Sequence, residues 1–332
     1  MQQPQNNKYQ INGIQQVGIG VNNLVETFNW YNKYKGFNIL VFDDVANAQL
    51  MTKYTGNSVE QRRALLSLNL NGGGGLEIWQ FTKRKPLSQK SPFLWGSLGI
   101  NALILKANTK TAQSYEQDLN GNWLVLEPTT DKKNTNSGVA GVVIGVSNME
   151  KALTFYRQLF KLKITSDKTI MGNEFYTISG GNEQFRKVEL CSTNENPGGF
   201  GTLYGKYKLV LLECLTAKRT KIYEDRYWGD LGYIHLCFDV FNLENLKSTA
   251  ANVGYHFTVD SADSFNMGAA AGRFAYLEDP DGTLIELVET HKVPICKPLN
   301  LYYNLRGDNG NKPVPNWLVK ALAIHEKRKL KK

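Results

Sequence analysis

A tight turn and the strand after it are encoded by the segment Asp279-Pro280-Asp281-Gly282-Thr283-Leu284-Ile285-Glu286. Its first four residues are typical of a type I turn with the glycine in the left-handed conformation. Apolar runs at residues 272–278 and 283–289 flank the turn. The sequence therefore predicts a β-hairpin here, as the end of a larger repeated unit.

One repeat links the two halves of the chain. Residues 14–37 read as a strand, an asparagine and an amphipathic helix, and the same plan returns 125 residues later. Asn23 matches Asn148 as the residue that caps the helix, and Tyr31 matches Tyr156 on the helix itself. Each copy therefore opens a module of the same kind.

A second repeat is offset by 133 residues, and it aligns Trp95-Gly96-Ser97-Leu98-Gly99 with Trp228-Gly229-Asp230-Leu231-Gly232. Each copy continues into a strand and then a predicted helix. Gly121 and Gly254 are expected just past these helices, where a left-handed glycine commonly ends a helix. The two repeats together predict four strand-helix-strands modules, beginning near residues 13, 97, 139 and 231.

The domain boundaries follow from how complete each module is. The second module offers only the run Trp123 to Leu126 after its predicted helix, and the polar stretch 129–138 then reads as a linker. We therefore expect an N-terminal domain at 11–128, with a truncated second module, and a C-terminal domain at 139–290.

The excess of positive charge is confined to the end of the chain. The formal net charge is +9, from 39 basic and 30 acidic residues, and ten of the basic residues lie in the tail at 291–332. The body is nearly neutral, so neither nucleic acid nor a membrane is an expected partner. Within the tail, residues 316–325 predict a short helix that docks through Trp317, Leu318 and Leu322.

Targeting and redox signals are weak. The first nine residues are rich in glutamine and asparagine and lack an apolar signal-peptide core. No run approaches the roughly 18 apolar residues of a membrane span. Four widely separated cysteines suggest neither a disulfide framework nor a paired-cysteine metal site. We expect a cytoplasmic protein.

The repeated strand-asparagine-helix openings, the strand that contains His235 and the hairpin at 279–286 resemble the vicinal-oxygen-chelate superfamily. This superfamily includes glyoxalase I, extradiol dioxygenases and bleomycin-resistance proteins, and the resemblance covers roughly residues 11–290. It implies an α+β fold of repeated βαβββ modules that form curved mixed sheets in two glyoxalase-like domains. Two modules of such a fold form a cup with a divalent metal at its base.

The resemblance also implies the ligands, because they come from the first and last strands of the paired modules. Sequence order favours pairing modules three and four, which selects Gly141, Glu213, His235 and Glu286. Glu213, His235 and Glu286 are then the expected ligands of Zn, Mn, Ni, Co or Fe, with Glu213 or Glu286 as the catalytic base. Gly141 stands where the family usually has a histidine or glutamine.

Two alternatives remain open at these positions. His235 alone on an apolar strand is also typical of a satisfied buried histidine, and Glu213 has the option of pairing with a basic side chain. Gln16 and Glu77 in the N-terminal half read as relics of a degenerate site. If module one pairs with module four instead, Gln16, Glu77, His235 and Glu286 reproduce the set of glyoxalase I-like enzymes.

The expected function is that of a metal-dependent enzyme with lyase, isomerase or epimerase chemistry on a small substrate with adjacent oxygens. A non-catalytic binding or resistance protein on the same fold is the alternative. A dioxygenase is the third hypothesis, disfavoured because Gly141 replaces a histidine ligand and residues 268–275 contain no histidine. A homodimer is a possible assembly.

Overall fold

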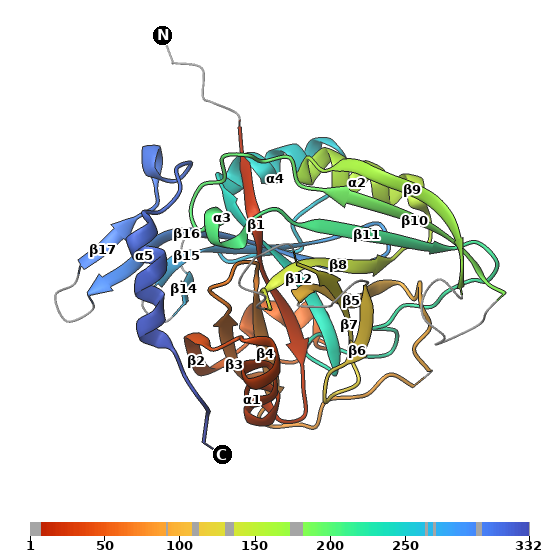
Figure 1. Ribbon diagram of the computed structural model, residues 1–332, viewed down its shortest axis with the longest axis horizontal. Coiled ribbons are helices and arrows are strands. Elements are labelled where there is room, and N and C mark those ends of the chain that lie inside the picture. Colours follow the sequence, from red (N-terminus) through yellow and green to blue (C-terminus); the bar gives the residue numbers. More distant parts are fainter. Residues whose placement is uncertain are drawn as a thin grey trace, which may run out of the picture.

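The computed structural model describes residues 8–90, 92–107, 113–129, 136–172, 182–262, 265–267, 270–296 and 301–331. In this part of the chain two curved mixed β-sheets carry helices α1 (Leu24–Lys35), α2 (Met149–Phe160) and α4 (Leu243–Asn252) (Figure 1). The predicted α+β class with repeated modules and curved mixed sheets is confirmed.

The large sheet has ten strands. Eight of them form a continuous path, in the order β13 (Val259–Asp260), β15 (Ala270–Glu278), β16 (Leu284–Cys296), β12 (Gly232–Phe241), β1 (Gln10–Gly20), β4 (Gly75–Phe81), β3 (Gln61–Leu68) and β2 (Ile39–Asn47). Off this path, β14 (Phe265–Met267) pairs with β15, and β17 (Leu301–Asn304) pairs with β16.

The small sheet has seven strands. Their order is β6 (Ser114–Gln117), β7 (Trp123–Pro128), β5 (Gly99–Ala107), β8 (Val139–Gly145), β11 (Lys208–Cys214), β10 (Gln184–Cys191) and β9 (Lys163–Met171).

Each sheet combines modules from both halves of the chain, which corrects the pairing that sequence order favours. In the large sheet β1 runs antiparallel to β12 and joins module one to module four. In the small sheet β5 runs antiparallel to β8 and joins module two to module three. β8 thus lies beside β5 in the small sheet, and β1 lies beside β12 in the large sheet. The expected domains, 11–128 and 139–290, therefore do not coincide with the two sheets.

The repeated asparagines cap their helices as expected. The side chain of Asn23 accepts a hydrogen bond from the backbone N–H of Glu26 (3.1 Å), and that of Asn148 accepts one from Lys151 (3.0 Å). Each cap satisfies a backbone donor that the first turn of a helix leaves unpaired. The two sites therefore start α1 and α2 in the same way.

The repeated tyrosines reveal a hairpin where the sequence predicted a helix. Tyr31 donates to Asp118 (2.9 Å), and Tyr156 donates to Asp279 (2.9 Å). Both aspartates sit in tight turns: residues 118–121 connect β6 and β7, as residues 279–282 connect β15 and β16. Gly121 has the expected positive φ of 81°, but it ends this turn and not a helix. The second module therefore has a last strand, β7, although its described residues form only three strands and no helix.

An apolar core is shared by both sheets and the three long helices. Phe28 and Tyr31 of α1, Phe155 of α2 and Leu246 of α4 are buried with strand residues such as Val142 in one cluster. Figure 1 shows α2 and α4 side by side. None of the described helices has the length and apolar character needed to span a membrane.

The tail docks through two of the three side chains that the sequence predicted. Helix α5 (Asn316–Ala321) and the 3-10 turn after it cover the predicted range. Leu318 is buried and Leu322 packs on the large sheet, but Trp317 is 53% exposed, so its predicted docking role is wrong. Near the end of the chain, the backbone of Leu330 exchanges two hydrogen bonds with Asn29 of α1.

Candidate metal centre

Four neighbouring strands of the large sheet bring one polar side chain each to a common point. These side chains are Glu286 of β16, His235 of β12, Gln16 of β1 and Glu77 of β4. Gly18 of β1 pairs with both His235 and Glu77. A Cβ at Gly18 would lie 2.4 Å from Cε1 of the imidazole, so only glycine leaves room for the His235 ring.

The candidate ligand atoms are close together and buried. His235 Nε2 lies 3.1 Å from Glu286 Oε2 and 3.3 Å from Glu77 Oε2, and the three ligand atoms all lie within 4.8 Å of one another. Gln16 Nε2 donates to Glu286 Oε2 at 3.4 Å. His235 is fully buried, and the Tyr276 hydroxyl lies 3.4 Å from its other ring nitrogen, Nδ1. The imidazole is therefore held on both sides.

Charge compensation controls the protonation of this cluster. Burial alone would lower the pKa of His235, but the carboxylates of Glu286 and Glu77 outweigh burial and raise that pKa to about 9. Burial acts in the opposite sense on Glu286, yet the charge and hydrogen bond of His235 keep the pKa of Glu286 below its usual value. Without a metal, the neutral-pH form is an imidazolium between carboxylates.

The donor set fits a divalent transition-metal ion. Two carboxylate oxygens and one imidazole nitrogen suit Zn, Mn, Ni, Co or Fe, and an amide oxygen is a further hard ligand. Gln16 Oε1 is such an oxygen, because it is buried and has no hydrogen-bond partner in the described structure. A bound cation would take the place of the proton on His235, since a ligating imidazole must be neutral.

A cavity of about 290 Å³ opens directly over the cluster, and Glu77 and Glu286 form part of its wall. Trp79, Trp228 and Tyr276 add aromatic rings to the lining, and residues 46–51 also line the cavity. The indole N–H groups of Trp79 and Trp228 are buried and lack acceptors in the described structure. Two residues of the cavity lining thus carry a donor that the described protein leaves without an acceptor.

Arg62 supplies a positive charge to the same cavity. Its guanidinium packs over the Trp79 ring, 5.0 Å from the centroid, and donates to the carboxylate of Asp44 at 2.7 Å. The Asp44 side chain is half exposed, so this ion pair lies at the solvent side of the cavity. The base of the cavity is therefore polar, its lining includes aromatic rings, and its solvent side carries the ion pair of Arg62 and Asp44.

The structure brings together two of the three residues that the sequence assigned to the metal. His235 and Glu286 meet, but Glu213 lies on β11 in the small sheet and is not part of the cluster. Glu77 stands in its place, as the alternative pairing of modules one and four predicted, although the favoured pairing made Glu77 a relic. The tyrosine-to-aspartate contacts do not reveal this arrangement, because they join module one to module two and module three to module four, whereas the sheets join one to four and two to three.

Comparisons with known proteins agree with this architecture. Residues 138–287 match the model of the Glyoxalase/Bleomycin resistance protein/Dioxygenase superfamily. Glyoxalase I from Zea mays has a TM-score of 0.51 at 12% sequence identity, over 85% of this chain and 92% of that chain. A mutant of glyoxalase I from Zea mays gives a TM-score of 0.53 at 12% identity, over 85% and 92%.

A putative dioxygenase from Bacillus subtilis has a TM-score of 0.50 at 12% identity, over 84% of this chain and 86% of that chain. At this level of identity the likeness concerns the fold. No curated protein matches the sequence. The resemblance drawn from the repeats and the hairpin is confirmed by the family match and by these folds.

Proposed function

We propose that this protein is a metal-dependent enzyme of the vicinal-oxygen-chelate type, because residues 138–287 match the model of the glyoxalase and dioxygenase superfamily. Its substrate is a small molecule with adjacent oxygen atoms, and its chemistry is that of a lyase, isomerase or epimerase. The buried cluster of Glu77, His235 and Glu286 beneath a cavity carries this proposal. A molecule in that cavity would lie against the two carboxylates.

The four polar side chains at the base of the cavity would hold the ion: Gln16, Glu77, His235 and Glu286. A bound divalent ion supplies Lewis-acid polarisation of substrate oxygens. The protein itself supplies the base. Glu286 is held by Gln16 and His235, whereas Glu77 contacts only His235 within the cluster. We therefore assign proton transfer to Glu77 first and to Glu286, the sequence-based candidate, second.

The walls of the cavity would orient the substrate and exclude water. The N–H groups of Trp79 and Trp228 donate to substrate oxygens, since they have no acceptor within the described part of the protein. The ring of Trp228 lies nearly parallel to the imidazole of His235, at 21° with centroids 6.5 Å apart, and so closes one side of the cluster. A desolvated site of this kind strengthens the electrostatic effect of every charge in it.

Elemental analysis tests the proposal directly. Protein purified without added metal should carry close to one divalent ion per chain, and His235→Ala should lose it. Glu213→Gln is the matched control, because it removes a carboxylate that lies in the other sheet, and it should keep the ion. Wild-type protein that holds no ion, and takes up none of Zn, Mn, Ni, Co or Fe, would contradict the proposal.

A non-catalytic binding protein on the same fold is the second candidate. One observation favours it: the imidazolium of His235 already offsets one of the two carboxylate charges without an ion. This candidate predicts ligand binding in the cavity by metal-free protein. Ring cleavage is a weaker third candidate, because the cluster contains a single histidine.

Location and assembly complete the proposal. We propose a cytoplasmic protein that forms a homodimer. Light scattering on the purified full-length chain tests the dimer, since a monomeric mass at micromolar concentration would contradict it. Cell fractionation tests the location.

A further inference from the structure

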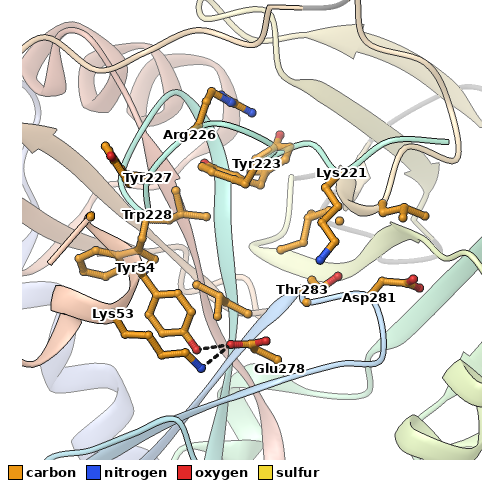
Figure 2. A pocket seen from close by; sticks show the side chains of 18 residues that line it. Lys53, Tyr54, Lys221, Tyr223, Arg226, Tyr227, Trp228, Glu278, Asp281 and Thr283 are labelled. Carbon is orange, nitrogen blue, oxygen red and sulfur yellow. Dashed lines mark hydrogen bonds and ion pairs between the residues drawn. The ribbon is translucent and has the colours of Figure 1, made fainter.

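A second, larger cavity of about 390 Å³ lies beside the candidate metal centre. The 3-10 helix η1 (Gln49–Tyr54), the loop at 221–228 and the turn between β15 and β16 line it (Figure 2). Trp228 lines both cavities. The rings of Tyr54, Tyr223 and Tyr227 add further aromatic surface, so the cavity is shaped to receive a flat apolar body.

Lys221 gives this cavity a positive charge, and none of the ion pairs among the described residues includes it, although its charge helps to lower the pKa of Glu278. Its backbone is fixed on both sides by Leu98, which donates to Thr220 O and accepts from Ile222 N, both at 2.9 Å. Figure 2 shows the Lys221 side chain directed toward Thr283 and Asp281. A Cβ on Gly282 would lie only 3.2 Å from its Nζ.

The two carboxylates of the cavity have other partners. Glu278 binds the ammonium of Lys53 at 2.9 Å and the hydroxyl of Tyr54 at 2.6 Å. Asp281 accepts a hydrogen bond from the backbone N–H of Ser147 at 2.9 Å. Lys221 therefore makes no ion pair with any residue that the structure describes, and its ammonium remains available.

Thr283 provides a second unsatisfied group in the same cavity. Its backbone N–H donates to Asp279 at 2.8 Å, which fixes the residue at the end of the turn. Its hydroxyl oxygen is buried and has no hydrogen-bond partner among the described residues, and the residue itself is 8% exposed. A buried hydroxyl without a partner costs free energy, which a ligand oxygen would recover.

Arg226 adds to the positive character of the cavity. It is buried, its Nε and NH1 groups donate to the backbone carbonyls of Ile222 and Leu231, and its guanidinium packs on the ring of Tyr223. No carboxylate among the described residues pairs with it. The charges of Lys53, Lys221 and Arg226 thus exceed those of Glu278 and Asp281.

We propose that this cavity is a separate binding site for a small aromatic anion, in which Lys221 and Thr283 bind the anionic group and the tyrosine rings hold the ring. A carboxylate and a phosphate monoester share the required chemistry. The site does not depend on the metal centre, so its test uses protein treated with a chelator.

Isothermal titration of the full-length chain with benzoate, phenyl phosphate, benzyl alcohol and inorganic phosphate tests the site. The two aromatic anions should bind, and benzyl alcohol and inorganic phosphate should bind more weakly. Lys221→Gln and Thr283→Val should each weaken the aromatic anions by about fivefold. Lys168→Gln, on an exposed strand of the small sheet, should leave them unchanged.

Two outcomes would overturn the proposal. One is the absence of saturable binding of either aromatic anion at millimolar concentration. The other is binding that survives Lys221→Gln and Thr283→Val but is lost in Arg62→Gln, which would place the anion in the cavity over the metal centre instead. Lys221 is exposed, so thermal unfolding of its variant should match the wild type and exclude a folding defect.

Discussion

Four neighbouring strands are arranged in the same way in each sheet, and we call each set a frame: β16, β12, β1 and β4 form the large frame, and β7, β5, β8 and β11 form the small frame. The centre of the large frame is polar, and the centre of the small frame is apolar. In the large sheet Gly18 pairs with His235 on one side and with Glu77 on the other. In the small sheet Val143 occupies the place of Gly18 and pairs with Ala102 and Val210. The remaining positions follow the same register, so that the large frame holds Gln16, Glu77, His235 and Glu286, and the small frame holds Gly141, Val210, Ala102 and Val125.

The sizes of the central residue and of its neighbour differ between the frames, which explains why only the large frame holds polar side chains. Gly18 leaves space for an imidazole, whereas Val143 faces the small side chain of Ala102. The small frame is then filled by an apolar cluster that includes Trp95 and Phe185. The fold supplies the frame twice, and the side chains at four positions determine whether it is a candidate metal site or a packed core.

The largest expected effect on stability comes from a carboxylate introduced into the small frame. Val210→Glu puts a carboxylate at the position that corresponds to Glu77, but among apolar neighbours with no histidine beside it. An unpaired buried carboxylate should destabilise the protein by about 4 kcal/mol. Urea unfolding measures this loss, and Val210→Leu, which changes only shape, is the control.

A loss near zero for Val210→Glu would show that the small frame already accepts charge. The two frames would then differ only in the residues that occupy them, and not in their ability to hold a buried charge. Uptake of a divalent ion by the same variant, measured by elemental analysis, would lead to the same conclusion.

The sequence predicted the frame better than it predicted which strands share it. The 125-residue and 133-residue repeats located all four modules, and the hairpin at 279–286 and the asparagine caps are where the sequence placed them. These features depend on local chemistry, such as turn glycines and cap side chains. Pairing between modules depends on long-range contacts, which leave no local pattern.

The error at Glu213 has the same origin. Glu213 is the only carboxylate on its strand, and no pattern in the sequence sets the register of β11. In the structure Val210 pairs with Val143, as Glu77 pairs with Gly18, so Glu213 lies three residues past the position that faces the frame. Since side chains alternate along a strand, that shift also turns Glu213 to the opposite face.

A second prediction concerns pH, because β12 carries buried charge where β5 does not. Asp239 is buried and accepts hydrogen bonds from Asn12 and Gln15, while Lys106 at the corresponding place in β5 is exposed. Burial, with a contribution from the charge of Glu289, raises the pKa of Asp239 to about 7. Its contribution to stability is therefore complete below its ordinary pKa and is lost as the pH rises through 7.

Wild-type protein should accordingly lose about 4 kcal/mol between roughly pH 4 and pH 8 that Asp239→Asn retains. The measurement is urea unfolding across this pH range, taken as the difference between the two proteins so that His235 and other groups cancel. Lys106→Gln should leave the slope unchanged. Parallel curves for wild type and Asp239→Asn would show that this carboxyl is ionised in the folded protein without cost.

The smallest expected effect concerns a side chain that contacts a ligand without itself binding the metal. Each frame has one tyrosine at the corresponding position. Tyr276 pairs with Glu286, and its hydroxyl faces Nδ1 of His235; Tyr115 pairs in the same way with Val125. A partner on the second ring nitrogen orients a ligating histidine, so Tyr276→Phe should lower metal affinity about tenfold. Tyr115→Phe removes the same hydroxyl from the small frame and should leave metal affinity unchanged. Competition titration with a chromogenic chelator measures both, and equal losses would mean that the two frames communicate through their shared core.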